Sequence, residues 1–173
     1  MKILIINTVP VAKNGITGVI YNLVRAVDKS KIRFDLLAIN NPEDNFIQEI
    51  ERLGGHVFIL RRTTKTIIQY QIKLFQLIRR NKYDIVHVHG NSNTIAFETI
   101  PAMFAGCKIR IAHSHNTTCE SKILNTFLAP FFFMSYTDGL ACGVEAGRWL
   151  FGSKPFTVIN NGIEVEKYRF SDE

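Results

Sequence analysis

Short apolar runs and longer helical patterns alternate along almost the whole chain of 173 residues. The sequence predicts strands over residues 3–6, 34–39, 57–60, 84–89, 109–113, 139–142 and 156–159. It predicts helices over residues 18–28, 43–53, 65–81, 92–105, 121–134 and 144–151. Strands that are apolar almost throughout are buried on both faces of a sheet, and alternation with helices is typical of βαβ units. We therefore predict an α/β fold, a Rossmann-like doubly wound parallel sheet of about seven strands with helices on both faces.

The composition is that of one globular domain. With 46% hydrophobic residues, the chain can bury a sizeable core. Cys107, Cys119 and Cys142 form no close pair, which argues against a zinc site and against a disulfide framework. The apolar run in MKILIIN is too short for a signal peptide or a membrane span. We therefore expect a reduced, cytoplasmic protein.

Polar residues follow several of the predicted strands. In open parallel sheets, ligands bind outside the carboxyl ends of the strands. The residues at or just beyond these ends include Asn7, His89, Asn91 and Asn116. We expect these four side chains to line a cleft.

Three of the five histidines, His89, His113 and His115, lie at the predicted edge, and His87 lies in the middle of a strand. His87 and His89 lie two apart on one strand and therefore share a face, and the same holds for His113 and His115. We interpret His87 and His113 as packing residues. His115 lies in a polar loop, where an imidazole can bond a sugar hydroxyl or stabilise developing charge, or can cap the loop by bonding only backbone groups. Because no carboxylate is close in sequence, we expect no metal site.

A glycine-containing loop joins the first predicted strand to the first helix. NTVPVAKNGITGVIYNL contains Gly15 and Gly18, and Thr17 is expected to cap the helix. The glycines either shape a turn or let the backbone approach a phosphate at the helix N-terminus. Neither GxGxxG nor GxxxxGK[ST] occurs, which disfavours nicotinamide dinucleotides and P-loop nucleotides.

The positive charge is concentrated between residues 52 and 83, which contain eight basic residues and no acidic one. Three interpretations remain open: a solvated helix face, an anionic membrane surface, and nucleic acid. Nucleic acid is the least favoured because aromatic residues are not interleaved with the basic ones. For a membrane surface, the contacting residues would be Lys73, Arg79 and Arg80 on an amphipathic helix.

Several segments together resemble a known family. They are MKILIIN with its glycine loop, LGGHVFIL, YDIVHVHG, IRIAHSHNT, ACGVEAGRWLFG and FTVINNGIEVEKYRF. In this order and spacing, they make the chain similar to the N-terminal domain of a family 4 glycosyltransferase with a GT-B fold, of the bacterial capsular and exopolysaccharide type. The resemblance assigns residues 1–160 to that Rossmann-like domain and residues 161–173 to an interdomain linker.

The resemblance implies a retaining transferase that uses no metal or other cofactor. It would move a sugar from a nucleotide-sugar donor to a glycan or polyprenyl-linked acceptor at the inner face of the cell membrane, and this half would bind mostly the acceptor. His115 matches the catalytic histidine of the cleft. Gly15 matches the loop that approaches the donor diphosphate, together with Asn14 and Thr17. Asn14 stands where the family usually has a second glycine.

The resemblance also implies a second, donor-binding domain that these residues do not contain. The family's E-x7-E glutamate pair is not found at a matching place, since Glu43 and Glu51 have that spacing on an early helix. We therefore expect the fragment alone to be inactive. One alternative is a free-standing Rossmann-like module that binds a small sugar or phosphorylated ligand without catalysis. Another is a protein that docks on a membrane or a partner through its basic helix.

Overall fold

A single parallel sheet of seven strands forms the centre of the protein. The structure is a computed structural model that describes residues 1–12 and 14–162. The strand order is β3-β2-β1-β4-β5-β6-β7, and every neighbouring pair is parallel. The strands are β1 (Lys2–Asn7), β2 (Arg33–Ala38), β3 (Val57–Ile59), β4 (Ile85–Gly90), β5 (Ile109–Ser114), β6 (Asp138–Ala141) and β7 (Thr157–Val158).

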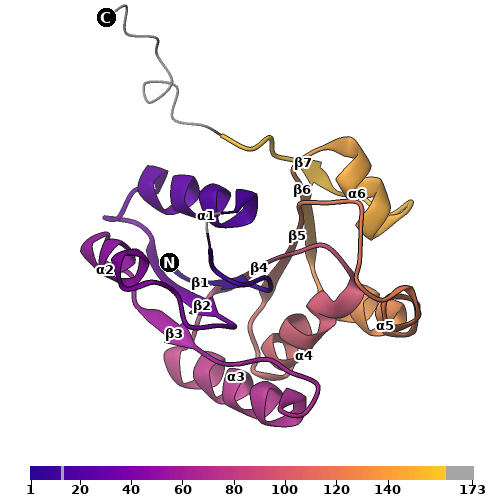
Figure 1. The fold of residues 1–173 in the computed structure, drawn as a ribbon, viewed down its shortest axis with the longest axis horizontal. Helices are drawn as coiled ribbons and strands as arrows, with labels where there is room; N and C mark the ends of the chain where they lie inside the picture. Colours follow the sequence, from indigo (N-terminus) through magenta and orange to yellow (C-terminus); the bar gives the residue numbers. More distant parts are fainter. Residues whose placement is uncertain (13, 163–173) are drawn as a thin grey trace, which may run out of the picture.

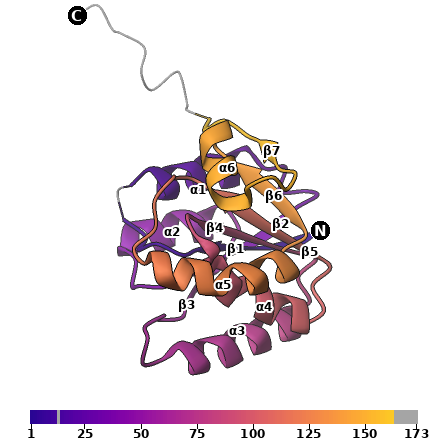
Figure 2. The ribbon, with the colours of Figure 1, turned by 90° about the vertical axis from the view of Figure 1, so that its right-hand side faces the viewer.

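Helices cover both faces of the sheet (Figures 1 and 2). One face carries α1 (Gly15–Ala26) and α2 (Asp44–Arg52), whose buried side chains pack with those of β1 and β2. The other face carries α3 (Ile67–Asn81), the 3₁₀ turn η1 (Asn93–Ile95), α4 (Ala96–Phe104) and α5 (Lys122–Ser135). The last helix, α6 (Val144–Phe151), packs beside β6. The predicted doubly wound α/β fold is confirmed.

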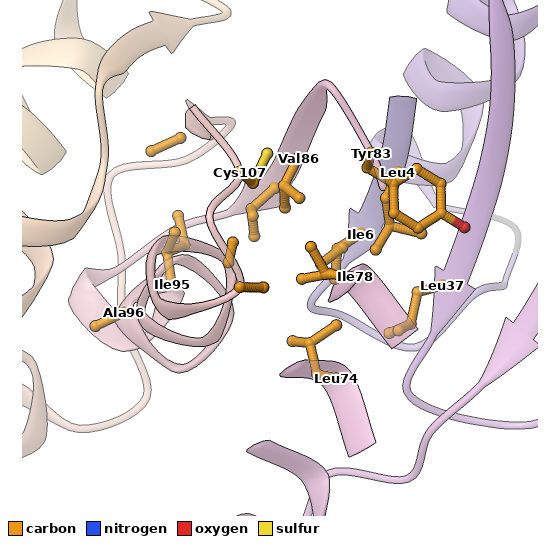
Figure 3. Close-up of a cluster of buried hydrophobic side chains, with 14 of the residues drawn as sticks. Leu4, Ile6, Leu37, Leu74, Ile78, Tyr83, Val86, Ile95, Ala96 and Cys107 are labelled. Carbon is orange, nitrogen blue, oxygen red and sulfur yellow. The ribbon is translucent and has the colours of Figure 1, made fainter. Parts of the chain in front are cut away.

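The larger core lies between the sheet and α3 to α5. Figure 3 shows Leu4 and Ile6 of β1 packed with Leu74 and Ile78 of α3 and with Val86 of β4. Successive residues of a strand point to opposite faces. Since Val86 and Val88 belong to this core, the histidines that alternate with them point to the α1 face.

The first helix begins three residues earlier than predicted, and its cap is not the expected one. Asn14 is the N-cap, and its side-chain oxygen accepts a hydrogen bond from the backbone N–H of Thr17 at 3.0 Å. The prediction that Thr17 caps this helix is therefore wrong. Thr17 lies inside the first turn and is buried.

We predict that Asn14→Ala lowers the free energy of unfolding by about 1 kcal/mol, because one N–H of the first turn loses its partner. Urea denaturation followed by circular dichroism measures the change. The control is Asn45→Ala, an exposed asparagine in the first turn of α2. An equal effect of the two substitutions would contradict the capping role.

Candidate functional site

Polar side chains of β1, β4 and β5 meet at the carboxyl edge of the sheet. The strand register pairs Asn7 with His89, and His89 with His113. Residues paired in this way point to the same face, so the three side chains form one row on the α1 side. Asn7 and His89 thus lie at the edge where they were expected, but both are fully buried.

Four histidines form a cluster on this face, which we call the imidazole cluster: His87, His89, His113 and His115. It contains two hydrogen-bonded pairs. Nε2 of His87 lies 3.2 Å from Nδ1 of His113, and Nδ1 of His89 lies 2.8 Å from Nε2 of His115. Within each pair the ring planes are close to parallel, with interplanar angles of 7° and 19°.

The two pairs lie against each other, with their rings tilted by 32°. The ring centroids of His87 and His89 are 4.2 Å apart, and so are those of His113 and His115. His87, His89 and His113 are buried, whereas His115 is half-buried. His115 lies at the same carboxyl edge as Gly15, because both follow parallel strands of one sheet.

Burial keeps the imidazole cluster neutral. Desolvation, together with the charges of neighbouring histidines, lowers the pKa of His87 to about 3 and the pKa of His115 to about 3. Desolvation lowers the pKa of His113 to about 4, and the pKa of His89 falls well below its ordinary value. Each ring therefore carries one proton at neutral pH, and each pair shares one hydrogen bond.

The same edge holds most of the unpartnered buried polar atoms. Within residues 1–12 and 14–162, five buried side-chain N or O atoms have no hydrogen-bond partner, and four of them belong to residues that end or follow β4 and β5. They are His89 Nε2, His113 Nε2, Asn91 Oδ1 and Asn93 Oδ1. Such atoms are costly unless a ligand or water satisfies them. This edge is therefore the strongest candidate for a binding site.

A hollow of about 680 Å³ opens at this edge on the α3–α5 side. Asn91 lines it, together with many hydroxyl groups and a few apolar side chains. The hydroxyl-bearing residues are Thr8, Thr63, Thr64, Ser92, Thr94, Thr118 and Ser121. A wall of this composition suits a polar ligand that carries several hydroxyl groups.

Arg62 lies in the wall of this hollow, and hydrogen bonds hold it in place. Its Nη1 donates to Oε1 of the fully buried Glu98 at 2.7 Å, and its Nη2 donates to the carbonyl of Thr8 at 3.1 Å. Tyr70 also donates to Oε1 of Glu98, at 2.8 Å. Burial raises the pKa of Glu98, while the Arg62 guanidinium opposes that shift. Counting Arg62 with the basic surface residues was therefore wrong. The signal for its inward position was the single acid in the otherwise uncharged segment AFETIPAMF.

The glycine loop forms a second hollow, of about 440 Å³, between α1 and α2. Asn14, Gly15 and Thr17 all line it, so the structure brings these three predicted residues together. A Cβ atom built on Gly15 would meet no heavy atom within 4 Å, so no described neighbour requires a glycine there. This open space agrees with the interpretation in which Gly15 faces a ligand.

The predicted residues do not all line one hollow. Asn7, His89, His115 and Asn116 line neither of the two, although all four lie at the carboxyl edge. Lys73, Arg79 and Arg80 lie along the exposed side of α3 and are remote from the imidazole cluster. A further hollow at the opposite edge is lined in part by Arg79 and Lys82.

The nearest approach to a metal-ligand set is formed by His87, His89 and His113. One ring nitrogen from each lies within 4.8 Å of the others. In residues 1–12 and 14–162, no cysteine or carboxylate completes this group. Two of the facing nitrogens already share a hydrogen bond. That the protein needs no metal therefore stays a prediction.

We predict that the protein loses stability as the pH falls below about 6.5, the ordinary histidine pKa. Below that pH the histidines of the unfolded chain become protonated, whereas those of the folded imidazole cluster stay neutral down to about pH 3 to 4. Each histidine contributes about 1.4 kcal/mol per pH unit in this window. The raised pKa of Glu98 has the opposite effect on stability, because the folded protein binds this proton more readily than the unfolded chain does. It is one group against four histidines. Urea unfolding at several pH values tests this, and a flat profile would contradict it.

We predict that Arg62→Met lowers the free energy of unfolding by about 3–5 kcal/mol, since it leaves the Glu98 carboxylate buried without its cation. Chemical denaturation provides the measurement. Arg61→Met is the matched control because Arg61 is the exposed neighbour in sequence. Similar stability of the two variants would show that the buried pair does not hold this edge together.

Solved structures share this fold. A crystal structure of Alr3699/HepE from Anabaena in complex with UDP has a TM-score of 0.71 and 15% identity, covering 99% of this chain and 47% of that chain. MurG from Acinetobacter baumannii has a TM-score of 0.66 and 10% identity, covering 94% of this chain and 46% of that chain. These likenesses establish the fold, which matches one half of GT-B glycosyltransferases.

Sequence comparison identifies the family. The glycosyltransferase EpsF of Bacillus subtilis (strain 168) is 28% identical over 169 residues, covering 90% of this chain and 44% of EpsF. The chain thus spans about half the length of the relatives it matches. The family model described as Glycosyltransferase Family 4 matches residues 13–167. This chain therefore belongs to glycosyltransferase family 4.

Proposed function

We propose that this chain is the acceptor-binding half of a retaining glycosyltransferase. The enzyme transfers a hexose-type sugar from a nucleotide-sugar donor to a glycan or lipid-linked acceptor in cell-surface polysaccharide synthesis. Membership of family 4 and the similarity to EpsF support the class of reaction. The observation that carries the proposal is the group of unpartnered buried polar atoms at the carboxyl ends of β4 and β5.

The glycine loop contributes to donor binding in this proposal. HepE was solved with UDP and with UDP and glucose, and MnaA of S. aureus, with a TM-score of 0.65, was solved with UDP. These neighbours support a nucleotide donor. The open space above Gly15 lets the loop backbone approach the diphosphate, and the N-terminus of α1 attracts its negative charge. One of the N–H groups at this helix end, that of Thr17, already donates to the side-chain oxygen of the N-cap Asn14.

The hydroxyl-lined hollow receives the acceptor. Its wall offers hydroxyl and amide groups to sugar hydroxyls, and Phe97, Ile67 and Leu124 offer apolar surface to the sugar ring. Arg62 is held by Glu98 and Thr8, so this part of the wall is rigid. The hollow and the imidazole cluster lie on opposite sides of the sheet at one edge, and a donor and an acceptor can meet there.

His115 is the catalytic residue in this proposal. Its imidazole is neutral at physiological pH, because burial lowers its pKa to about 3. A neutral imidazole can hydrogen-bond a donor-sugar hydroxyl and stabilise the charge that develops as the bond to the diphosphate breaks. Retention at the anomeric carbon and independence of metal are further parts of the proposal.

We predict that His115→Ala lowers the turnover of the transferase by about 10² or more, the scale lost with one transition-state contact. The assay follows sugar transfer by the protein in the longest form that its reading frame encodes. His56→Ala is the control, because His56 is exposed at the amino end of β3 and outside the imidazole cluster. Near-normal turnover of the His115 variant would remove this residue from catalysis. Ligand binding by the unaltered protein with no transfer would favour the free-standing binding module.

A second function, docking on an anionic membrane, is favoured by the solvent side of α3. Tyr70, Leu74 and Ile78 of this helix are buried, but Ile68 is 73% exposed and Ile72 is 52% exposed. Lys73, Arg79 and Arg80 are exposed on the same helix. Apolar residues beside basic ones on a surface helix fit a bilayer with anionic headgroups.

The position of α3 connects docking with transfer. Ile67, its first residue, lines the acceptor hollow, and the helix runs from there to the opposite edge of the sheet. A polyprenyl-linked acceptor could therefore keep its lipid in the bilayer below α3 while its sugar enters the hollow. In residues 1–12 and 14–162, none of the helices has the length and apolarity to cross a bilayer.

We predict that this chain co-sediments with vesicles containing phosphatidylglycerol and that changing Lys73, Arg79 and Arg80 to Gln weakens the partition constant by about 10²-fold, at about 1 kcal/mol per basic residue. The matched control changes Lys29, Arg33 and Lys154, also exposed, to Gln. Ile68→Ser with Ile72→Ser tests the apolar contact. Equal binding of all variants, or equal binding to neutral phosphatidylcholine vesicles, would contradict docking through α3.

A further inference from the structure

The hydrogen bond between His89 and His115 determines what His115 can offer to a ligand. Nδ1 of His89 lies 2.8 Å from Nε2 of His115, so Nε2 of His115 is already occupied. The two nitrogens of an imidazole point in divergent directions, and Nδ1 of His115 therefore points away from His89. No residue in the described part of the chain donates to or accepts from that Nδ1. It is the nitrogen left for a substrate.

We propose that His89 is a positioning residue that fixes the tautomer of His115, so that His115 presents a protonated Nδ1 to the cleft as a hydrogen-bond donor. The importance of this donor for turnover rests on the proposed function of His115. The tautomer itself can be established without any assay of transfer.

Two proton arrangements are compatible with the short contact. In the first, His89 donates its Nδ1–H to Nε2 of His115, which leaves Nε2 of His89 bare and puts the proton of His115 on Nδ1. In the second, His115 donates its Nε2–H to Nδ1 of His89, which puts a proton on Nε2 of His89 and leaves Nδ1 of His115 bare. The hydrogen bond made by one nitrogen thus decides the state of the other.

The surroundings of His89 favour the first arrangement. His89 is fully buried, and its Nε2 has no partner among the described residues. A buried N–H without an acceptor is rare in proteins. The register partner of His89 on β1 is Asn7. The Asn7 oxygen accepts from the backbone N–H of Val9 and its amide donates to Oγ1 of Thr17 at 3.5 Å, and neither group bonds His89. A bare Nε2 forgoes one acceptor bond, whereas an Nε2–H would leave a buried donor without an acceptor, which is the rarer case.

The second pair of the imidazole cluster has the same proton arrangement, in which an Nδ1–H donates to an Nε2. Nδ1 of His113 faces Nε2 of His87 at 3.2 Å, and Nε2 of His113 is buried without a described partner. The register neighbour of His113 on its far side is Leu140, which offers no side-chain acceptor. His113 therefore carries its proton on Nδ1 and donates to His87. Its ring also contacts that of His115, with centroids 4.2 Å apart and planes tilted by 32°, which restrains the His115 ring.

A protonated Nδ1 limits the chemistry of His115. It can donate to an oxygen lone pair of the donor sugar or of the departing diphosphate, but it cannot accept the proton of an attacking hydroxyl. His115 would therefore act as a fixed hydrogen-bond donor and not as a general base.

The experiment is long-range proton–nitrogen NMR on the chain with ¹⁵N-labelled histidine at neutral pH, which identifies the protonated nitrogen of each ring. We expect His115 protonated at Nδ1 in the unaltered protein. In His89→Leu the Nδ1–H form of His115 should lose its predominance, and in His89→Asn, which keeps an amide donor near the same place, it should persist. His56 serves as an internal reference. An unaltered protein with His115 protonated at Nε2 overturns the proposal without any variant, and so does an unchanged His115 spectrum in His89→Leu.

Steady-state kinetics of the His89 variants provide a second, separate test. His89→Leu should lower kcat about tenfold or more with little change in KM, and His89→Asn should restore part of it, as for other residues that orient a functional histidine. A loss that His89→Asn does not relieve would count against positioning. If the tautomer is as proposed but His115→Ala turns over normally, the proposed function fails and the positioning by His89 stands. If the tautomer is wrong but His115→Ala is inactive, the positioning fails and the proposed function stands.

Discussion

The parallel pairing of β1, β4 and β5 is the constraint on which the rest of the structure depends. Because the three strands run in one direction, they end at one edge, and their register puts Asn7, His89 and His113 in one row. Because side chains alternate along a strand, the valines of β4 enter the core beside α3 while its histidines face α1. One pairing pattern thus builds the main core and the candidate site together.

The two sides of the site hold their polar groups differently. On the α1 side, four neutral imidazoles bond one another in pairs and leave two buried ring nitrogens without partners among the described residues. On the other side, a charged pair of Arg62 and Glu98 is buried and supplemented by Tyr70 and a backbone carbonyl. The first arrangement leaves hydrogen-bonding capacity for a ligand. The second holds Arg62 in the wall of the hydroxyl-lined hollow. This division of polar groups is consistent with a site where two substrates meet.

Most of the fold could be predicted from the sequence, because hydrophobic periodicity and glycine or polar boundaries are local signals. All seven strands and the six main helices occur near their predicted places. The start of α1 was missed because its cap, Asn14, lies before the apolar periodicity begins. The partners of the histidines could not be predicted, since they depend on the strand order and register between segments 26 residues apart. Arg62 was misjudged because its partner Glu98 lies 36 residues away. Part of the predicted linker, residues 163–173, lies outside the described residues.

The central claim is that substrates bind at the carboxyl edge of β1, β4 and β5. Hydrogen–deuterium exchange of the protein, in the longest form its reading frame encodes, tests this most directly when nucleotide-sugar donor and glycan acceptor are added. We expect slower exchange at the backbone amides of residues 14–18, 90–94 and 114–118. Protection confined to the opposite edge, around residues 82–84 and 106–109, would contradict the account.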